Sequence, residues 1–407
     1  MNFVFVSPNF PIRYFKWVES LKRRGINVLG VGDTPYFDTL PRLRSALTEY
    51  YYVHNMSDFE EMKRAIGYFQ DKYGHIDYIE SDNEWWLESD AKLREVFGVT
   101  TGFHPSEMRK IKAKSAMKEC FQNAGVKTMR YLLVNGPESL EDALKFSSKV
   151  GYPLFVKPDI GVGASHSYKL ENEGELRDFL KEKLPETYIM EEYIYGIIVS
   201  YDGICDDSSN VVFETSDHFP IPPSEIVDGS NDDYYYTNPF SLPMPDIDKE
   251  AFSKAGRSVI KSFGIKKRFF HIEFFVLNKD KPGFASRGEI VALECNMRPP
   301  GGYTPDLINF GESLSCYEIY ADVIAYNENR QDDTKTKYYS ITASRRDNLS
   351  YVHNDEEIFA AFGQSITATG RYPDHLADDM GNSYFFAKFE KLEDALAFER
   401  FVREKKA

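Results

Sequence analysis

The sequence is poor in cysteine and in long apolar runs, and each shortage excludes a class of protein. Its four cysteines are scattered among 407 residues without a Cys-x-x-Cys pair, so neither a zinc site nor a disulfide framework is indicated, and free thiols are expected. No segment reaches the roughly 20 apolar residues that cross a bilayer. The first residues also lack the basic and apolar regions of a signal peptide. We therefore expect a cytoplasmic protein without a membrane partner.

Positive charge is outnumbered by negative charge: 49 lysines and arginines stand against 64 aspartates and glutamates, which gives a formal net charge of -15. An acidic surface argues against binding to a nucleic-acid backbone, which needs clustered lysine and arginine. It does not exclude a small anion such as a nucleotide, whose site needs only local basic side chains or a metal ion. The hydrophobic share of 42% and the charged share of 28% are typical of a globular protein.

Three familiar motifs of catalysis and nucleotide binding are missing as well. No Gly-x-Gly-x-x-Gly follows the first expected strand, and no Gly-x-x-x-x-Gly-Lys-Ser/Thr or Gly-x-Ser-x-Gly occurs. A dinucleotide site on the first strand, a P-loop and a serine nucleophile of the hydrolase type are therefore not supported.

The pattern that is present begins with alternating strands and helices. Strands are expected at 3–7, 26–33 and 76–81, and the helices between them stop at Gly25 and Gly74. This order predicts a parallel, doubly wound sheet. Residues 104–125 are expected to form one long basic helix. Beyond it, the pattern predicts a second α/β unit, a largely antiparallel sheet, a Pro/Asp/Tyr-rich loop at 221–245 and an amphipathic helix at the end.

Two expected strands carry the main chemical signal. Glu273 lies in "FFHIEFFV" and Glu294 in "VALECNMR", and the short connection between them predicts an antiparallel hairpin. Glu294, Asn296 and Arg298 occupy every second position of an expected strand, so their side chains are expected to point the same way. Two carboxylates and an amide suit Mg²⁺ or Mn²⁺, and Arg298 suits a phosphate or carboxylate. The alternative is a row of solvent-facing polar residues on a half-exposed sheet.

Two further segments are compatible with a nucleotide. In "YPLFVKPDIGVGASHS", Lys157 ends a strand and is followed by Gly161, Gly163, Ala164 and Ser165, whose small size allows backbone N–H groups to approach phosphate oxygens. In "YIMEEYIYG", a strand runs into Glu191, Glu192, Tyr193 and Ile194, where backbone groups are available to an adenine edge and the two acids to ribose hydroxyls. Taken singly, an ordinary glycine-rich hairpin and a charged strand end explain these segments equally well.

In their order, "YPLFVKP…GVGAS", "IMEEYIYG", "HIEFF" and "LECNMRPPGG" resemble the ATP-grasp superfamily, in particular biotin carboxylase, the carbamoyl phosphate synthetase large chain and L-amino-acid ligases. The resemblance covers roughly residues 1 to 330. It implies an ATP-grasp fold of mixed α/β and α+β class. The expected parts are an N-terminal doubly wound domain (1–108), a small lobe with the glycine-rich loop (109–188), a large lobe with the hinge and the metal site (189–325) and a C-terminal α+β portion (326–407).

The resemblance also implies roles for individual residues. Lys114 and Lys157 would contact the nucleotide phosphates, Gly161 to Ser165 would cover them, and Glu191 to Ile194 would form the adenine hinge. Glu273, Glu294 and Asn296 would hold Mg²⁺ (or Mn²⁺), and Arg298 together with Lys157 would act in catalysis. His271 either orients a metal ligand or is an ordinary core histidine. The sequence departs from the family at Ile198, where an acid is common, and at Ala113, where an aspartate often precedes the lysine, so Lys112 is an alternative to Lys114.

The implied activity is ATP-dependent ligation of a carboxylate to an amine (or thiol) through an acyl phosphate, with release of ADP and phosphate. The alternatives are a bicarbonate-activating enzyme and a non-catalytic ATP-binding regulator. Both substrates would be small molecules, nucleic acid is not expected as a partner, and many relatives are homodimers. Candidate contacts to the second substrate are Glu84, Asp232, Asp233, Arg345 and Arg346.

Overall fold

The computed structural model describes residues 1–161, 166–221, 233–245 and 247–406. Gly163, Ala164 and Ser165, which were expected to cover the phosphates, lie outside the described residues, as does Asp232. Within the described part of the chain, no helix is long and apolar enough to cross a membrane.

The N-terminal part is a four-stranded parallel sheet with the order β3-β2-β1-β4. The strands are β1 (Asn2–Val6), β2 (Asn27–Gly32), β3 (Glu49–Tyr52) and β4 (Tyr78–Glu80), and the helices are α1 (Phe15–Arg23), α2 (Pro41–Ala46), α3 (Phe59–Tyr73) and α4 (Leu87–Phe97). Phe3 and Phe5 pack with α1, whereas Val4 packs with α3, because successive strand residues point to opposite faces. The predicted doubly wound sheet is therefore present.

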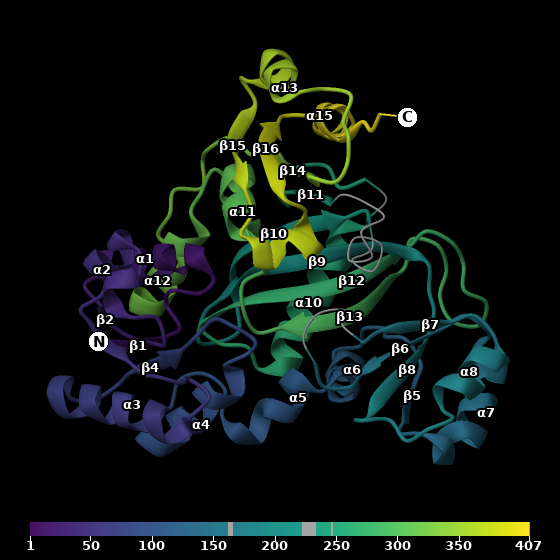
Figure 1. Cartoon of the computed structure of the whole chain (residues 1–407), viewed down its shortest axis with the longest axis horizontal. Helices are drawn as coiled ribbons and strands as arrows, with labels where there is room; N and C mark the ends of the chain where they lie inside the picture. Colours follow the sequence, from purple (N-terminus) through teal and green to yellow (C-terminus); the bar gives the residue numbers. More distant parts are fainter. Residues whose placement is uncertain (162–165, 222–232, 246, 407) are drawn as a thin grey trace.

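The small lobe contains the sheet β5-β8-β6-β7, in which each pair of neighbouring strands is antiparallel. Its strands are β5 (Tyr131–Val134), β6 (Leu154–Pro158), β7 (Tyr168–Leu170) and β8 (Tyr188–Glu192), and α7 (Leu140–Val150) and α8 (Glu173–Phe179) pack on it. In Figure 1 this lobe lies on the opposite side of the molecule from the N-terminal sheet.

The prediction of one helix over residues 104–125 is wrong. The segment forms α5 (Met108–Lys112) and α6 (Lys114–Asn123), with Ala113 between them in an extended conformation at φ -91° and ψ 118°. Ala113 forms a β-bridge with Ile160, and the backbone N–H and the hydroxyl of Ser115 donate to the two carboxylate oxygens of Asp159 at 2.7 and 2.9 Å. Tertiary pairing with the end of β6 therefore outweighs the helical propensity of the segment and fixes the start of α6.

The largest sheet has eight strands in the order β13-β12-β9-β10-β11-β14-β16-β15. They are β9 (Gly196–Cys205), β10 (Val211–Phe219), β11 (Tyr234–Thr237), β12 (Arg268–Leu277), β13 (Ile290–Asn296), β14 (Tyr339–Arg345), β15 (Ile366–Arg371) and β16 (Ser383–Phe389). Helix α10 (Lys249–Phe263) covers one face of β9 and β12. Part of the predicted loop 221–245 is therefore strand β11, which pairs with β10 and β14.

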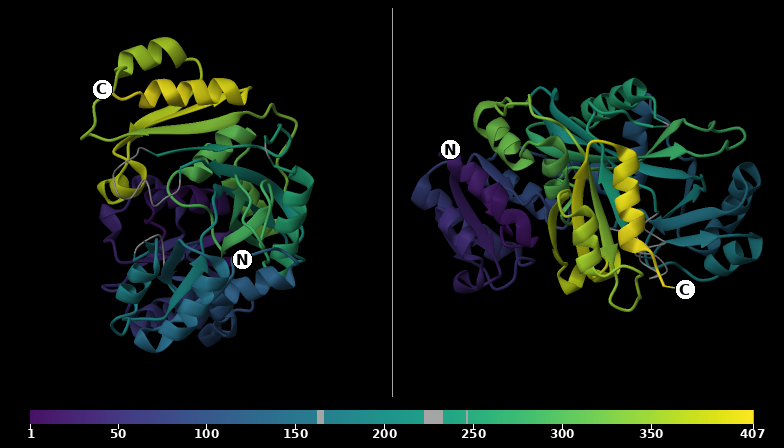
Figure 2. Two further views of the ribbon diagram at one scale, coloured as in Figure 1. Left: turned by 90° about the vertical axis from the view of Figure 1, so that its right-hand side faces the viewer. Right: turned by 90° about the horizontal axis from the view of Figure 1, so that it is seen from above.

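The C-terminal strands continue this sheet instead of building a sheet of their own (Figure 1). Helices α13 (Asp355–Phe362) and α15 (Leu392–Arg403) pack on them, and α14 (Ala377–Met380) lies between β15 and β16 in the chain. In the left view of Figure 2, α13 and α15 lie above these strands and the small lobe lies below them. The domain boundaries drawn from the sequence remain predictions.

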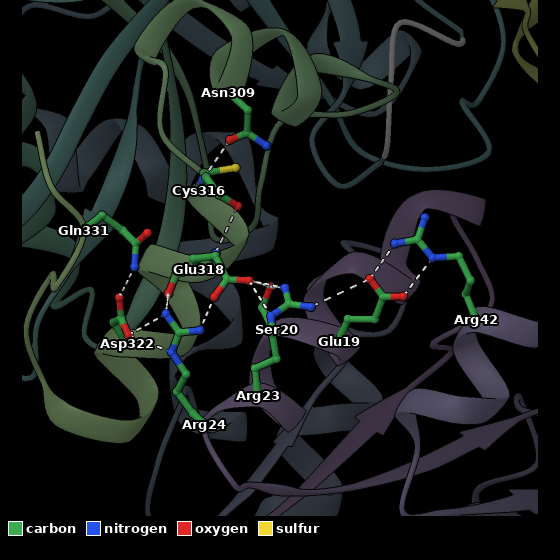
Figure 3. Close-up of polar contacts among 11 residues, drawn as sticks. Glu19, Ser20, Arg23, Arg24, Arg42, Asn309, Cys316, Glu318, Asp322 and Gln331 are labelled. Atoms are coloured by element: carbon green, nitrogen blue, oxygen red, sulfur yellow. Dashed lines mark hydrogen bonds and ion pairs between the residues drawn. The ribbon is translucent and has the colours of Figure 1, made fainter. Parts of the chain in front are cut away.

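A polar seam joins the N-terminal domain to the large lobe, where α1 meets α12 (Cys316–Tyr326); α11 (Thr304–Glu312) precedes α12 (Figure 3). The Glu318 carboxylate accepts hydrogen bonds from Ser20 (2.8 Å), Arg23 and Arg24. Arg24 also donates to Asp322 at 2.8 Å. Because Trp17 of α1 additionally packs edge-on against aromatic rings of α12, the two parts are held by apolar and ionic contacts together.

Candidate active site

The centre of the candidate site is a pair of facing glutamates. Strands β12 and β13 form the predicted antiparallel hairpin, and Glu273 lies directly opposite Glu294, as His271 does opposite Asn296. Residues directly opposite in such a pair share a face of the sheet. The side chains of Glu273 and Glu294 keep 25% and 23% of their surface exposed, so both carboxylates are lodged in the protein but remain within reach of a ligand.

The Glu273 carboxylate is positioned by a series of ionic contacts that runs through His271 to Asp202. His271 contacts Glu273 through Nε2 at 3.1 Å and Asp202 of β9 through Nδ1 at 2.6 Å. Burial alone would lower the pKa of His271, but the carboxylates of Asp202 and Glu273 together outweigh burial and raise that pKa to about 10. Burial would raise the pKa of Glu273, yet the adjacent imidazolium lowers it. The arrangement keeps Glu273 ionised and fixes one of its oxygens.

Glu294 has the opposite electrostatic environment. Burial and the facing Glu273 carboxylate raise its pKa, against the opposing effect of Lys114. Two carboxylates forced together in this way favour a bound cation. Among the described residues, no three His, Cys, Asp or Glu side chains are grouped to hold a metal by themselves. Two carboxylates and the Asn296 amide fit a hard cation that takes its remaining oxygens from substrate phosphate and water, as Mg²⁺ does.

Two lysines stand beside the carboxylate pair. Lys114 Nζ lies 3.9 Å from Glu294 Oε1 and donates to the backbone carbonyl of Gly161 at 3.1 Å. Lys157, at the end of β6, lies 3.1 Å from Glu191 Oε2. Burial would lower the pKa of Lys157, but the carboxylates of Glu191, Glu294 and Glu273 raise it. The break at Ala113 thus places Lys114 beside Glu294, whereas the alternative, Lys112, donates to the backbone carbonyl of Glu84 at 3.3 Å.

The end of β8 differs from expectation in its side chains. The Glu191 carboxylate is buried between lysines, and Glu192 is paired with Arg130 at 2.6 Å, with its side chain fully buried. Neither acid is free to reach a ribose, so that part of the prediction is wrong. Tyr193 and Ile194 follow the last residue of β8, and Ile194 packs against residues of β12 and β13. The segment expected to form the adenine hinge therefore lies next to the β12–β13 hairpin, and its role remains a prediction.

Arg298 follows the end of β13 and brings the N-terminal domain into the site. Its Nη2 and Nε atoms donate to one oxygen of Glu84 at 2.7 and 3.2 Å. Glu84 comes from the loop after β4, at the carboxyl edge of the parallel sheet, where ligands bind in such sheets. Two other candidates for contacting the second substrate, Arg345 and Arg346, donate instead to backbone carbonyls of the C-terminal part.

Sequence reasoning missed two residues of the site. Lys118 lies 2.5 Å from Glu191 and is 1% exposed. The sequence pattern that could have revealed its burial is its position four residues after Lys114, on the same helix face as the apolar Phe121. Asp202 was hidden in a strand whose inward residues are otherwise small or apolar, and only its pairing opposite His271 reveals its role.

Comparison with known proteins identifies relatives of this architecture. Residues 110–213 match the family described as "Carbamoyl-phosphate synthase L chain, ATP binding domain". The carbamoyl phosphate synthase large chain of Thermotoga sp. (strain RQ2) is 26% identical over 208 residues, which are 47% of this chain and 16% of that protein. The chain therefore spans about one sixth of such relatives. The L-arginine-specific L-amino acid ligase of Bacillus subtilis is 23% identical over 290 residues, covering 68% of this chain and 64% of the ligase.

Solved structures extend the likeness to the whole chain. The L-amino acid ligase from Bacillus licheniformis has a TM-score of 0.71 at 15% identity, with 98% of this chain and 96% of that chain covered. The N5-carboxyaminoimidazole ribonucleotide synthetase from Thermotoga maritima has a TM-score of 0.67 at 14% identity, with 99% and 97% covered. The predicted resemblance and fold class are thereby confirmed: the chain has the ATP-grasp fold, and its residues 110–213 are similar to the ATP binding domain of the carbamoyl-phosphate synthase L chain.

Proposed function

We propose that this protein is an ATP-dependent ligase that joins a small carboxylate to an amine (or thiol) and releases ADP and phosphate. The observation that carries the proposal is the pairing of Glu273 with Glu294 across the β12–β13 hairpin, with Lys114 3.9 Å from Glu294. The likeness to ligases supports it, since proteins named L-amino acid ligase occur among both the sequence relatives and the structural neighbours.

In this proposal the small lobe and the hinge bind the nucleotide. Lys114 and Lys157 neutralise phosphate charge, and the segment that begins at Gly161 lies over the phosphates. The backbone from Glu191 to Ile194 meets the adenine. Lys114 is already tied to the Gly161 carbonyl, so the lysine and the start of that segment are positioned together. Neutralisation by fixed groups inside a protein is more effective than in water because these groups need no reorganisation.

Glu273, Glu294 and Asn296 would hold Mg²⁺ (or Mn²⁺), which would supply positive charge that neutralises the ATP phosphates during phosphoryl transfer to the carboxylate substrate. Arg298 would grip the transferred phosphoryl group or the acyl phosphate that the carboxylate substrate forms. Glu84 orients Arg298 through two contacts to one oxygen. No side-chain nucleophile is required, because the substrates supply both attacking groups.

The proposal is tested by incubating the purified protein with Mg²⁺, ATP and paired panels of carboxylic acids and amino acids, and by measuring ADP and phosphate. We expect ADP release that requires the metal and is stimulated only when a carboxylate and an amine are both present. Turnover stimulated by bicarbonate alone would replace this function with bicarbonate activation. Tight binding of Mg·ATP without turnover, unchanged by Glu294→Gln, would instead indicate a regulator.

A cytoplasmic location and a homodimer also belong to the proposal. All four cysteines are free thiols, which fits a reducing compartment. One structural neighbour is described as a biotin carboxylase domain dimer. Light scattering of the purified chain tests the dimer directly, and a mass of a single chain would remove it.

A further inference from the structure

A single buried glutamate is shared by two lysines at the candidate nucleotide site. Glu191 Oε1 lies 2.5 Å from Lys118 Nζ, and Oε2 lies 3.1 Å from Lys157 Nζ. Glu191 is 2% exposed, Lys118 1% and Lys157 9%. The three groups are therefore desolvated together, and the trio has two positive charges and one negative charge.

The two lysines are not equivalent. Lys118 points into the protein, where its ammonium also donates to Thr128 Oγ1 at 2.9 Å, and Thr128 is bridged to Ala292 of β13. Lys157 is the last residue but one of β6, and its pKa is raised by the carboxylates of Glu294 and Glu273 as well as by Glu191. Glu191 thus has one partner fixed in the interior and one partner that faces the site.

This asymmetry matters because Lys157 is the lysine proposed to meet a phosphate. A lysine whose only partner is a buried glutamate can grip a phosphate only by leaving that carboxylate uncompensated, and breaking a buried ion pair in this way is strongly unfavourable. A second lysine on the same carboxylate removes that cost, because Glu191 remains paired when Lys157 turns away. It also leaves the trio with a net positive charge before the phosphate arrives.

We propose that Lys118 is a positioning residue for nucleotide binding, which keeps Glu191 paired so that Lys157 is released to an ATP phosphate. The inference rests on the proposed ATP-dependent function and adds to it a residue that contacts no ligand itself. Lys118 acts on the phosphate only through Glu191 and Lys157.

The test measures binding of a non-hydrolysable ATP analogue with Mg²⁺ to the full chain by calorimetry. Lys118→Met should raise the Kd at least about tenfold, because Glu191 then holds Lys157 alone. Lys118→Arg should keep the Kd close to that of the unmodified protein. The decisive variant is Lys118→Met with Glu191→Gln, in which no carboxylate competes for Lys157, and it should recover most of the lost affinity. Lys127→Met, which removes an exposed ion pair to Glu289, is the matched control.

Thermal unfolding of each variant separates binding from folding. A folded double variant that binds no better than Lys118→Met would overturn the inference and leave Lys118 a structural residue. If Lys118→Met does not fold, Glu191→Gln alone decides: binding at least as tight as in the unmodified protein supports the release of Lys157, and weaker binding contradicts it. Failure of the unmodified protein to bind the analogue would remove the proposed function itself, which distinguishes the two failures.

Discussion

Replacing Glu294 by glutamine should distinguish a role of this carboxylate in catalysis from a role in stability. Directly opposite side chains in an antiparallel pair lie about 5 Å apart at Cβ, so two carboxylates there repel by about 3 kcal/mol at an effective dielectric constant of about 20. On the same scale, Lys114 at 3.9 Å attracts Glu294 by about 4 kcal/mol. The two charge effects nearly cancel, and the neutral glutamine avoids the cost of burying a charge, so Glu294→Gln should lower the free energy of unfolding by no more than about 1 kcal/mol.

Turnover should respond quite differently. Removing one group that neutralises developing charge typically lowers kcat by about 10²–10³-fold, so metal-dependent ADP release should fall by that factor. The melting temperature should move by only about 2 °C, the equivalent of 1 kcal/mol in a chain of this size. The assays are coupled ADP release and thermal unfolding, with and without Mn²⁺. Glu289→Gln, which removes an exposed carboxylate just before the same strand, is the control and should leave both quantities unchanged.

Two results would refute this reasoning. Turnover within about threefold of the unmodified protein would show that Glu294 holds no catalytic cation, since loss of a charge-neutralising group costs far more. A loss of activity that merely follows a large loss of stability would show that the carboxylate is structural. The metal should raise the melting temperature of the unmodified protein more than that of Glu294→Gln, because a ligand that binds only the folded state stabilises it.

Three further predictions follow from other contacts. Glu84→Gln frees Arg298 from its ionic partner and should lower kcat about tenfold while leaving the Kd for the ATP analogue unchanged; steady-state kinetics and calorimetry measure the two, and an unaltered kcat would contradict the positioning role. Burial, reinforced by Glu80, raises the pKa of Asp82 to about 7, so the folded state binds a proton that the unfolded chain releases, and stability should fall as pH rises from about 4 to about 7. Asp82→Asn should therefore raise the melting temperature more at pH 8 than at pH 5, and equal shifts would refute the assignment. Glu318→Ala removes the shared acceptor of the α1–α12 seam and should cost about 2 kcal/mol in unfolding free energy, with no effect on analogue binding; a stability unchanged in denaturant titration would show that the seam adds nothing.

Local periodicity was sufficient to predict the hairpin and the N-terminal sheet. Glu273 and Glu294 lie in apolar strands that follow each other in the chain and are joined by residues 278–289, so their pairing depends on contacts close in sequence. The alternating strands and glycine-ended helices of the first hundred residues are equally local. In both cases the side chains that define the pattern are the ones that pack or pair in the structure.

The predictions that failed depended on contacts distant in sequence. Nothing in the residues around Ala113 disfavours a helix, and the break arises from a bridge to Ile160. Glu191 and Glu192 were expected to face a ribose. That expectation failed because both acids form ion pairs with residues from separate elements, Lys118 and Arg130. For the same reason Lys118 was not recognised: a buried lysine can be understood only when its carboxylate partner is known.

The continuity of the eight-stranded sheet has a practical consequence for dissecting this protein. Strand β11 pairs along its whole length with β14, and Tyr235 and Tyr236 are covered by C-terminal aromatic and aliphatic side chains. A chain shortened before β14 would present an open strand edge beside uncovered tyrosine rings, which is a template for aggregation. The part of the chain before β14 should therefore not be obtainable as a well-behaved fragment, and swapping of the C-terminal segment between relatives would have to respect the pairing of β11 with β14.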